Sequence, residues 1–506
     1  MPESYDKLAA YTRKVATLGS VSALSSWDQE TYMPRKAAEA RSEQSALLAG
    51  MLHERITSTE LGDLISAAEA DKEVMGDDEL AASIREFRRD YDKATKIPGE
   101  LVSDIARTGS RAQEAWKDAR ERSDFEGFAP WLEKVMGLSR RKAECLGIPE
   151  SAGKDGELYD ALLDDYEPAT SAKEIEAVFT PLAKELADLL QELRGGKHPG
   201  ASILDTHVPA DRQHKFGLFI IEKLGFDMEA GRLDVTTHPF CSGFGPGDTR
   251  LTTRYRDERF TDALYGTMHE CGHGLYEQGL PKHERFGEPL ADSVSLGIHE
   301  SQSRLWENLV GRSLPFWEWA LPHAKEMLGG DLRGATPETM FKAVNTAEPS
   351  FIRVEADEAT YNAHVFVRFE IERAVFSGDL KVRDIPGVWD EKYKQYLGIT
   401  PPDHRRGCLQ DVHWSFGLLG YFPTYTLGNL YACQLWDKIN EDIPTLDDQM
   451  RKGEFGELLA WLTDNIHQHG RRYPAPELAE RATGKKLSAE PLLRHLKGRL
   501  KPVYGV

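Results

Sequence analysis

Two histidines, His269 and His273, have the type and spacing needed to bind one metal ion. Residues four apart project from the same face of a helix, so both imidazoles can reach a single ion. Glu270 lies in the same turn, close enough to take a proton from a water bound to that ion. The segment His-Glu-Cys-Gly-His has the H-E-x-x-H pattern typical of zinc peptidases. Because chains rich in glutamate and histidine match so short a motif by chance, the rest of the sequence has to support it.

The sequence around the motif predicts a helix that presents both histidines on one side. Apolar residues at Phe260, Leu264, Met268 and Leu275 repeat with a period of about 3.6 residues. Residues 261–278 contain no proline. The helix alone supplies two ligands, whereas a catalytic zinc usually takes three from the protein and leaves one position for water.

The third ligand is predicted on a second helix. Glu277 lies one turn beyond His273, and three turns of one straight helix do not surround an ion tetrahedrally. Glu300 lies in the weakly charged segment 290–303, where a buried acid needs a cation or a hydrogen-bond donor. We therefore predict Glu300 as the ligand, with an ion pair to Arg304 as the alternative. Glu307 lies on about the same face and is predicted to orient a metal-bound histidine.

Two further clusters contain residues suited to peptide chemistry. Arg353 can bind a carboxylate through two parallel hydrogen bonds, and a structural ion pair with Asp357 is the alternative. His413 and Tyr421 can donate hydrogen bonds to the oxyanion that forms when water attacks an amide, and Tyr425 follows Tyr421 by four residues. For each of these side chains, a satisfied position in the core is the alternative.

Composition excludes several classes of protein. The 506 residues are 40% hydrophobic and 29% charged, which suits a large core surrounded by solvated helices. A net charge of −20 argues against nucleic acid as the main partner. The first twenty residues do not form a signal peptide, and no apolar run is long enough to span a membrane. The five cysteines contain no C-x-x-C pair, so we expect a soluble protein in the reducing cytoplasm.

Most segments have the apolar spacing of helices, and the sequence predicts a mainly α fold. The clearest predicted helices cover residues 37–55, 78–96, 99–122, 128–144 and 172–193. The glycine-rich loop at 195–200 is predicted to separate an N-terminal helical half from a catalytic half. Residues 233–240 and 249–255 are predicted to be extended, with 242–247 as the turn between them. This hairpin or small sheet would let a peptide bind as an added strand, and an ordinary surface hairpin is the alternative.

Taken together, these elements resemble the carboxypeptidase Taq family of metallocarboxypeptidases along nearly the whole chain. Six short motifs occur in the family's order. They are Trp27 to Pro34, Asp248-Thr249-Arg250-Leu251-Thr252 after His238-Pro239-Phe240, the H-E-x-x-H segment, His299-Glu300-Ser301-Gln302, Ile352 to Asp357, and Gly407 to Trp414. None of them departs from the family's pattern.

The resemblance implies a large helical metallopeptidase with a deep groove between two halves and a small β-sheet beside the active-site helix. It implies one catalytic domain over residues 1–506, with 1–200 as the N-terminal half and 201–506 as the half carrying the metal site. Members release single amino acids from peptides with a free C-terminus, with broad specificity and poor activity on C-terminal proline. They use zinc, and cobalt also activates them. A cytoplasmic homodimer, without nucleic acid or membrane partners, is the expected state.

By motif position, the resemblance makes His269, His273 and Glu300 the metal ligands. Glu270 is then the general base, and Arg353 is the anchor for the substrate's C-terminal carboxylate.

Other positions are carried over less directly. His413 and Tyr421 are implied as oxyanion or carboxylate contacts, and Arg250, His238 and Tyr425 as residues that line the substrate groove.

Two other classes of protein fit part of the pattern. A helical oligopeptidase or dipeptidyl carboxypeptidase also combines H-E-x-x-H with a distant glutamate, and it would release dipeptides or larger fragments. A binding or scaffold protein with a structural metal would close its site with four protein ligands, preferably cysteines. Cys271 lies inside the motif, but its position points it away from the face shared by the two histidines.

Overall fold

The computed structural model describes residues 1–329, 332 and 334–506. The N-terminal helices are α1 (Glu3–Thr31), α2 (Ala38–Ile56), α3 (Thr59–Ala70), α4 (Lys72–Met75) and α5 (Asp78–Lys96). The next helices are α6 (Gly99–Arg122), α7 (Phe125–Leu146), α8 (Asp160–Leu163), α9 (Ala172–Arg194) and α10 (Ala210–Leu224). The strands β1 (Gly231–Val235), β2 (Cys241–Gly245) and β3 (Asp248–Thr253) precede α11 (Phe260–Gly279). The remaining helices are α12 (Lys282–Arg285), α13 (Leu296–Arg304), α14 (Leu314–Leu328), α15 (Pro337–Val344), α16 (Tyr361–Ser377), α17 (Ile385–Leu397), α18 (Pro423–Asp442), α19 (Leu446–Met450), α20 (Gly456–Asn465), α21 (Ala475–Thr483) and α22 (Glu490–Tyr504).

The mainly helical fold with a small sheet is confirmed. Helices α5 and α6 have the predicted bounds, and α2, α7 and α9 begin and end within three residues of theirs. Side-chain caps explain part of this agreement, because they define where α5, α7 and α9 begin. The Asp77 side chain accepts hydrogen bonds from the first turn of α5, and Ser171 and Glu174 form a capping box at α9. Within the described residues, no helix is long and apolar enough to cross a bilayer.

The sheet differs from the predicted hairpin. Its order is β1-β3-β2, with β1 parallel and β2 antiparallel to the central β3. Residues 242–245, predicted to lie in a turn, are part of strand β2, and the reversal itself occurs at Pro246 and Gly247. The sequence predicts the glycines of this stretch as turn residues. Gly243 instead lies within the strand, where the backbone closely approaches side chains of neighbouring segments.

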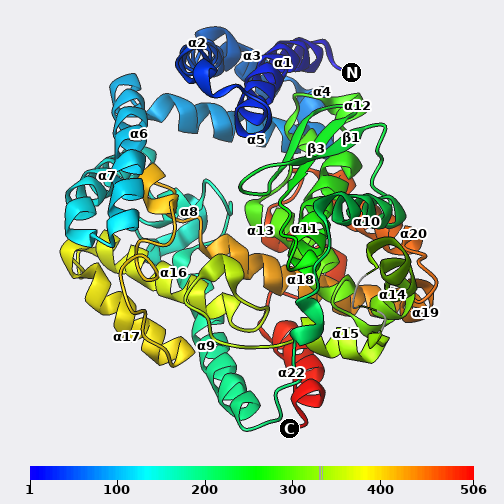
Figure 1. Cartoon of the computed structure of the whole chain (residues 1–506). Coiled ribbons are helices and arrows are strands. Elements are labelled where there is room, and N and C mark those ends of the chain that lie inside the picture. Colours follow the sequence, from blue (N-terminus) through cyan, green and yellow to red (C-terminus); the bar gives the residue numbers. More distant parts are fainter. Residues whose placement is uncertain (330–331, 333) are drawn as a thin grey trace.

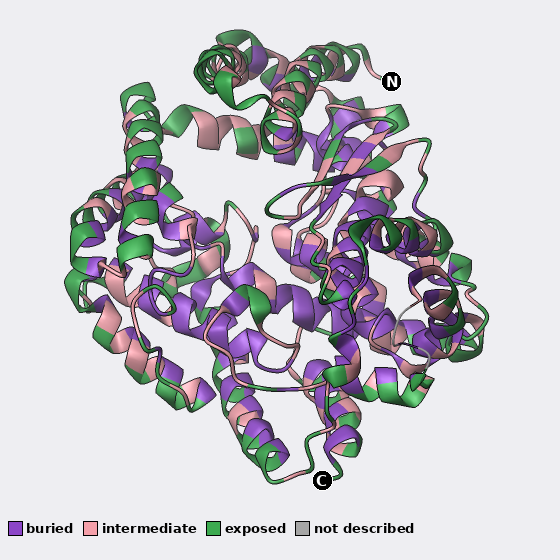
Figure 2. Cartoon of the chain, in the orientation of Figure 1, coloured by how far each residue is buried: buried purple, intermediate pink, exposed green. Residues whose placement is uncertain are grey.

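The helices are arranged around one large hydrophobic core, with α18 passing through the middle of the molecule (Figure 1). Buried residues from α6 through α22 contribute to this core. A smaller core of Tyr5, Leu8, Leu61, Ile65, Ala68, Val74, Leu80 and Ile84 joins α1, α3, α4 and α5. Figure 2 shows this contrast, with buried residues concentrated along the central helices and exposed residues on α1 and α2 at the top. Helix α2 itself contains no buried residue.

Helix α11 lies between the sheet and α13, and one glycine sets how closely the two helices approach. A Cβ at Gly272 would lie 2.5 Å from the carbonyl oxygen of Gln302 and 2.6 Å from the Cα of Ser303. Only glycine leaves room for this backbone contact. At the start of α13, the Ser295 hydroxyl caps the helix and the buried Glu167 carboxylate accepts from Gly297 N–H at 2.9 Å.

We expect Gly272→Ala to lower the free energy of unfolding by about 1–3 kcal/mol, because the added methyl must separate α11 from α13. Gly266→Ala on the same helix is the matched control. Its Cβ would meet only the Thr253 hydroxyl, at 3.8 Å. The better helix propensity of alanine is then expected to add up to about 1 kcal/mol. Denaturant unfolding of both variants checks this, and equal stabilities would contradict the close approach.

Candidate metal centre and active site

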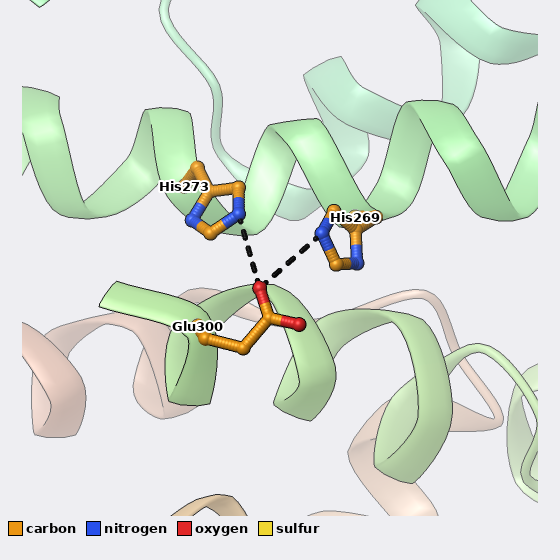
Figure 3. A group of neighbouring side chains, drawn as sticks. All are labelled: His269, His273 and Glu300. Atoms are coloured by element: carbon orange, nitrogen blue, oxygen red, sulfur yellow. Dashed lines mark ion pairs between the residues drawn. The ribbon is translucent and has the colours of Figure 1, made fainter. Parts of the chain in front are cut away.

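Three side chains from two helices converge on one point (Figure 3). His269 and His273 project from α11, and Glu300 projects toward them from α13. The Oε2 atom of Glu300 lies 3.5 Å from the Nε2 atom of each histidine. One ligand atom from each residue lies within 4.8 Å of the others, which suits a single ion between them.

The hydrogen bonds of the two imidazoles leave the correct nitrogen free for an ion. His269 Nδ1 lies 2.9 Å from Glu307 Oε2, and His273 Nδ1 lies 2.5 Å from His299 Nδ1. Both Nε2 atoms therefore face the Glu300 carboxylate as candidate ligands. Burial lowers the pKa of His273 to about 4, so its ring is neutral, which is the form that binds metals. Two imidazole nitrogens and one carboxylate oxygen make a donor set that fits zinc.

Glu300 is in position to act both as a metal ligand and as the ion-pair partner of Arg304, the two roles that the sequence left open. Its Oε1 accepts from Arg304 Nε at 2.7 Å, while its Oε2 accepts from Ser303 Oγ at 3.1 Å and faces the two histidines. Burial opposes ionisation of this carboxyl. The neighbouring Arg304 and His269 nevertheless hold its pKa well below the ordinary value. The ion pair therefore keeps Glu300 negatively charged and directs one oxygen toward the candidate metal position.

Glu307 lies in a π-helical segment, η5 (Leu305–Val310), which continues from α13. Its carboxylate contacts His269 and also accepts from Arg304 and Arg312, at 3.3 and 3.2 Å. Burial opposes its ionisation, but Arg304 and His269 lower the pKa of Glu307 to about 2. The π turn is a departure from α geometry of the kind often found at functional sites.

Glu270 lies beside this group and differs from its neighbours electrostatically. It is 6% exposed, and burial raises the pKa of its carboxyl to about 7. The negative charges of Glu300 and Glu307 act in the same direction. A carboxyl that both releases and accepts a proton near neutral pH is suited to general acid–base chemistry.

Arg353, at the start of η7 (Arg353–Glu355), is buried and aligned by Asp411 rather than by Asp357. Its Nε and Nη2 atoms donate to Asp411 Oδ1 at 3.1 and 2.9 Å, and its Nη1 donates to Tyr361 Oη at 2.8 Å. Arg368 also donates to Asp411, so two guanidinium groups share one carboxylate. The group therefore keeps a net positive charge, and Arg353 retains unused N–H groups.

An aromatic cluster joins Arg353 to the convergent side chains. The Tyr361 ring lies 4.3 Å from the Arg304 guanidinium, and the Tyr425 ring lies 4.8 Å from that of Arg353. His413 Nε2 lies 3.4 Å from Tyr425 Oη, and the Tyr421 ring centroid lies 5.4 Å from that of His413.

His413 belongs to this cluster and has one ring nitrogen without a hydrogen-bond partner among the described residues. Burial lowers the pKa of His413 to about 3, so the ring is neutral. Its Nδ1 atom is buried and has no hydrogen-bond partner within the described part of the chain. A buried polar atom in this state is suited to contact a bound molecule.

The structure places Arg250 and His238 in a different setting. Arg250, on β3, pairs with Asp248 at 2.8 Å, and its guanidinium lies 4.4 Å from the Trp27 ring of α1. His238 is exposed in the connection between β1 and β2. These two residues lie at the sheet and its junction with α1, whereas Arg353, His413, Tyr421 and Tyr425 form one group.

Sequence reasoning missed a chain of contacts behind His273. His299 Nε2 lies 2.9 Å from Glu277 Oε1, and Glu277 also forms an ion pair with Lys282. Burial opposes ionisation of Glu277, but His299 and Lys282 lower its pKa to about 2. The signals were present in the sequence, because His299 directly precedes Glu300 and Glu277 follows His273 by one turn. The pairing of Asp411 with Arg353 was also not predicted.

Comparison with known proteins decides the family. A model described as Carboxypeptidase Taq (M32) metallopeptidase matches residues 7–500. The chain belongs to this family. It is a carboxypeptidase, and the metallopeptidase family implies a divalent metal ion, for which the His269, His273 and Glu300 group is the candidate site.

Individual M32 relatives match this chain over nearly their whole lengths. The chain is 46% identical to thermostable carboxypeptidase 1 of Thermus thermophilus, with 100% of both chains covered. It is 38% identical to thermostable carboxypeptidase 1 of Pyrococcus furiosus, with 98% of both covered. The crystal structure of the M32 carboxypeptidase from Deinococcus radiodurans R1 superimposes with a TM-score of 0.95 at 39% identity, covering 99% of this chain and 100% of that one.

Proposed function

We propose that this chain is a zinc-dependent carboxypeptidase that releases one amino acid at a time from peptides with a free C-terminus. The specificity is broad, C-terminal proline is a poor substrate, and cobalt can replace zinc. The observation that carries the proposal is the convergence of His269, His273 and Glu300 beside the buried acid Glu270. We assign the first three as metal ligands and Glu270 as the general base.

The proposed chemistry is hydrolysis of the last peptide bond. A divalent ion held by His269, His273 and Glu300 would lower the pKa of a water to about 7 and would polarise the scissile carbonyl. Glu270 takes a proton from the attacking water and later delivers it to the leaving amine, as its pKa of about 7 allows. Glu307 orients His269 through the hydrogen bond to Nδ1. Arg304 holds Glu300 so that one oxygen remains for the metal.

Arg353 is proposed to bind the substrate's C-terminal carboxylate and so place the cut one residue from the end. The positive charge that it shares with Arg368 and Asp411 attracts an anion, and its free N–H groups can donate to one. His413 and Tyr421 are proposed to donate hydrogen bonds to the developing oxyanion or to the carboxylate. Tyr425, Arg250 and His238 are proposed as residues that line the path of the peptide.

We expect Arg353→Ala to lower kcat/KM by about 30-fold or more on free peptides, since loss of a buried charge partner costs roughly 2–5 kcal/mol. Paired peptides with a free or an amidated C-terminus provide the measurement. The parent is expected to prefer the free peptide strongly, and the variant to lose most of that preference.

The matched control is Arg373→Ala, on helix α16. It breaks the ion pair between Arg373 and Glu157 and should keep the preference. If Arg353→Ala retains the parent's discrimination between the two peptides, Arg353 is a structural residue and not the anchor.

Mass spectrometry of a time course on an unblocked peptide tests the proposed function as a whole. The expected result is a ladder that shortens from the C-terminus by single residues, stops with chelator and resumes with Zn²⁺ or Co²⁺. Release of dipeptides would assign the alternative oligopeptidase or dipeptidyl carboxypeptidase class. A peptide ending in proline is expected to resist.

The organisation of the molecule is part of the same proposal. We propose one catalytic domain over residues 1–506, with an N-terminal half to about residue 200 and a half carrying the metal site from 201 to 506. We also propose a homodimer that works in the cytoplasm. Sedimentation of the purified chain measures the first of these two properties, and a monomer at micromolar concentration would contradict it.

A further inference from the structure

The two candidate histidine ligands are held in different ways. His269 Nδ1 meets the Glu307 carboxylate directly, which is the common arrangement for a metal-binding histidine. His273 Nδ1 instead meets a second imidazole, that of His299, and only His299 reaches a carboxylate, that of Glu277. A second imidazole ring therefore lies between the candidate ligand and the nearest carboxylate in this chain of contacts, that of Glu277.

The direction of the hydrogen bonds in this chain is set at its two ends. Glu277 is a carboxylate paired with Lys282, so it accepts, and His299 Nε2 must carry the hydrogen. At the near end, a His273 that binds an ion through Nε2 carries its hydrogen on Nδ1, which donates to His299 Nδ1. The remaining nitrogen of His273, Nε2, is left with its lone pair facing Glu300 Oε2. The chain of contacts thus provides an acceptor for the Nδ1 hydrogen of the His273 tautomer that a metal requires.

The surroundings of the chain keep it in place. The side chains of His299, Glu277 and Lys282 are 16%, 14% and 10% exposed. The His299 ring also packs between those of His273 and Tyr276, with centroid distances of 4.6 and 5.3 Å. In strand β2, a Cβ at Gly243 would overlap the Glu277 carboxylate and the Lys282 ammonium group, so the glycine leaves the space that this ion pair occupies.

We propose that His299, Glu277 and Lys282 act as a positioning relay that holds the orientation of His273 by accepting its Nδ1 hydrogen, and thereby determines how tightly the site retains its metal. This inference rests on the ligand set of the proposed function. It assigns a role to His299 beyond that of a neighbour of Glu300, and it links the sheet to the metal site through Gly243 and Glu277.

The test measures the zinc affinity of the full-length protein by competition with a chromophoric chelator. His299→Leu removes both ring nitrogens, and we expect the affinity to fall about 10- to 100-fold. In His299→Asn, the side-chain carbonyl can accept from His273 Nδ1–H, so this variant should recover most of the parent affinity. His467→Leu is the matched control, because His467 is also buried and also packs on Tyr276, but it bonds to Gln302 instead of a candidate ligand. It should keep the parent affinity even where its stability falls.

A second variant keeps the test decisive if His299→Leu does not fold. The double substitution Glu277→Leu with Lys282→Met removes the ion pair as a unit and leaves no buried charge unpaired. It should weaken zinc binding about 10-fold.

The outcomes separate the relay from the function on which it rests. Parent affinity in His299→Leu, or an equal loss in His299→Leu and His299→Asn, would show that His299 only fills space. A parent protein that binds no zinc at this site would instead refute the ligand set itself.

Discussion

Glu270→Gln is expected to bind zinc like the parent and to lose about 10²–10⁴-fold in kcat, the usual contribution of a general base. Glutamine has nearly the same shape as glutamate but cannot take a proton from water. Glu270 follows the candidate ligand His269, and burial raises the pKa of its carboxyl to about 7. The proposed role is proton transfer, which the glutamine variant removes. The measurements are kcat on a free peptide and the zinc content of the same preparation.

Glu288→Gln provides a matched control for loss of a buried acid. Glu288 is 2% exposed and burial raises its pKa, but its hydrogen-bond partner is Tyr5 of α1. This variant should keep the parent kcat. Normal turnover in Glu270→Gln, with zinc bound, would end the assignment of Glu270 as the base.

Glu300→Gln is expected to weaken zinc binding by more than the roughly 100-fold that loss of an outer hydrogen bond can cost. The amide oxygen can still accept from Arg304 Nε, as the carboxylate does at 2.7 Å. The amide nitrogen then faces the two imidazoles, and an N–H donor cannot bind a cation. The shape and packing of the side chain are retained, so the variant isolates the ligand itself. Chelator competition measures the affinity.

Glu307→Gln gives the comparison that distinguishes a ligand from its support. The Glu307 carboxylate contacts Nδ1 of His269, whereas Nε2 of the same ring faces the candidate metal position. Loss of this carboxylate should therefore lower the zinc affinity by about 10- to 100-fold. We expect the order parent, Glu307→Gln, Glu300→Gln from tightest to weakest. The opposite order for the two variants would move the third ligand away from Glu300.

The parts of the fold that depend on local chemistry were predictable from the sequence. Helices α5 and α6 begin where Asp77 caps the chain or Pro98 precedes it, and their predicted bounds agree with the structure. The group of His269, His273 and Glu300 was also predictable. The histidine spacing defines one helix face, and an acid in a weakly charged helix needs a cation.

Features that depend on tertiary contacts were not predictable in the same way. Gly243 lies in a glycine-rich segment that is typical of a turn. Only the packing of Glu277 against β2 explains why a glycine lies within a strand here. Arg353 pairs with Asp411, which is 58 residues away in sequence, although Asp357 is four residues away and has the same charge. Spacing along the chain favours Asp357 as the partner of Arg353. In the folded chain, η7 lies beside the segment before α18, and this brings Asp411 to Arg353 instead.

The central claim is that one divalent ion is held by two imidazoles of α11 and one carboxylate of α13. An anomalous difference map at the zinc absorption edge, from crystals of the zinc-loaded protein, tests it most directly. We predict a single peak about 2.0–2.2 Å from the Nε2 atoms of His269 and His273 and from a Glu300 oxygen, with one coordination position left to solvent. A peak elsewhere, or a fourth protein ligand closing that position, would contradict the account.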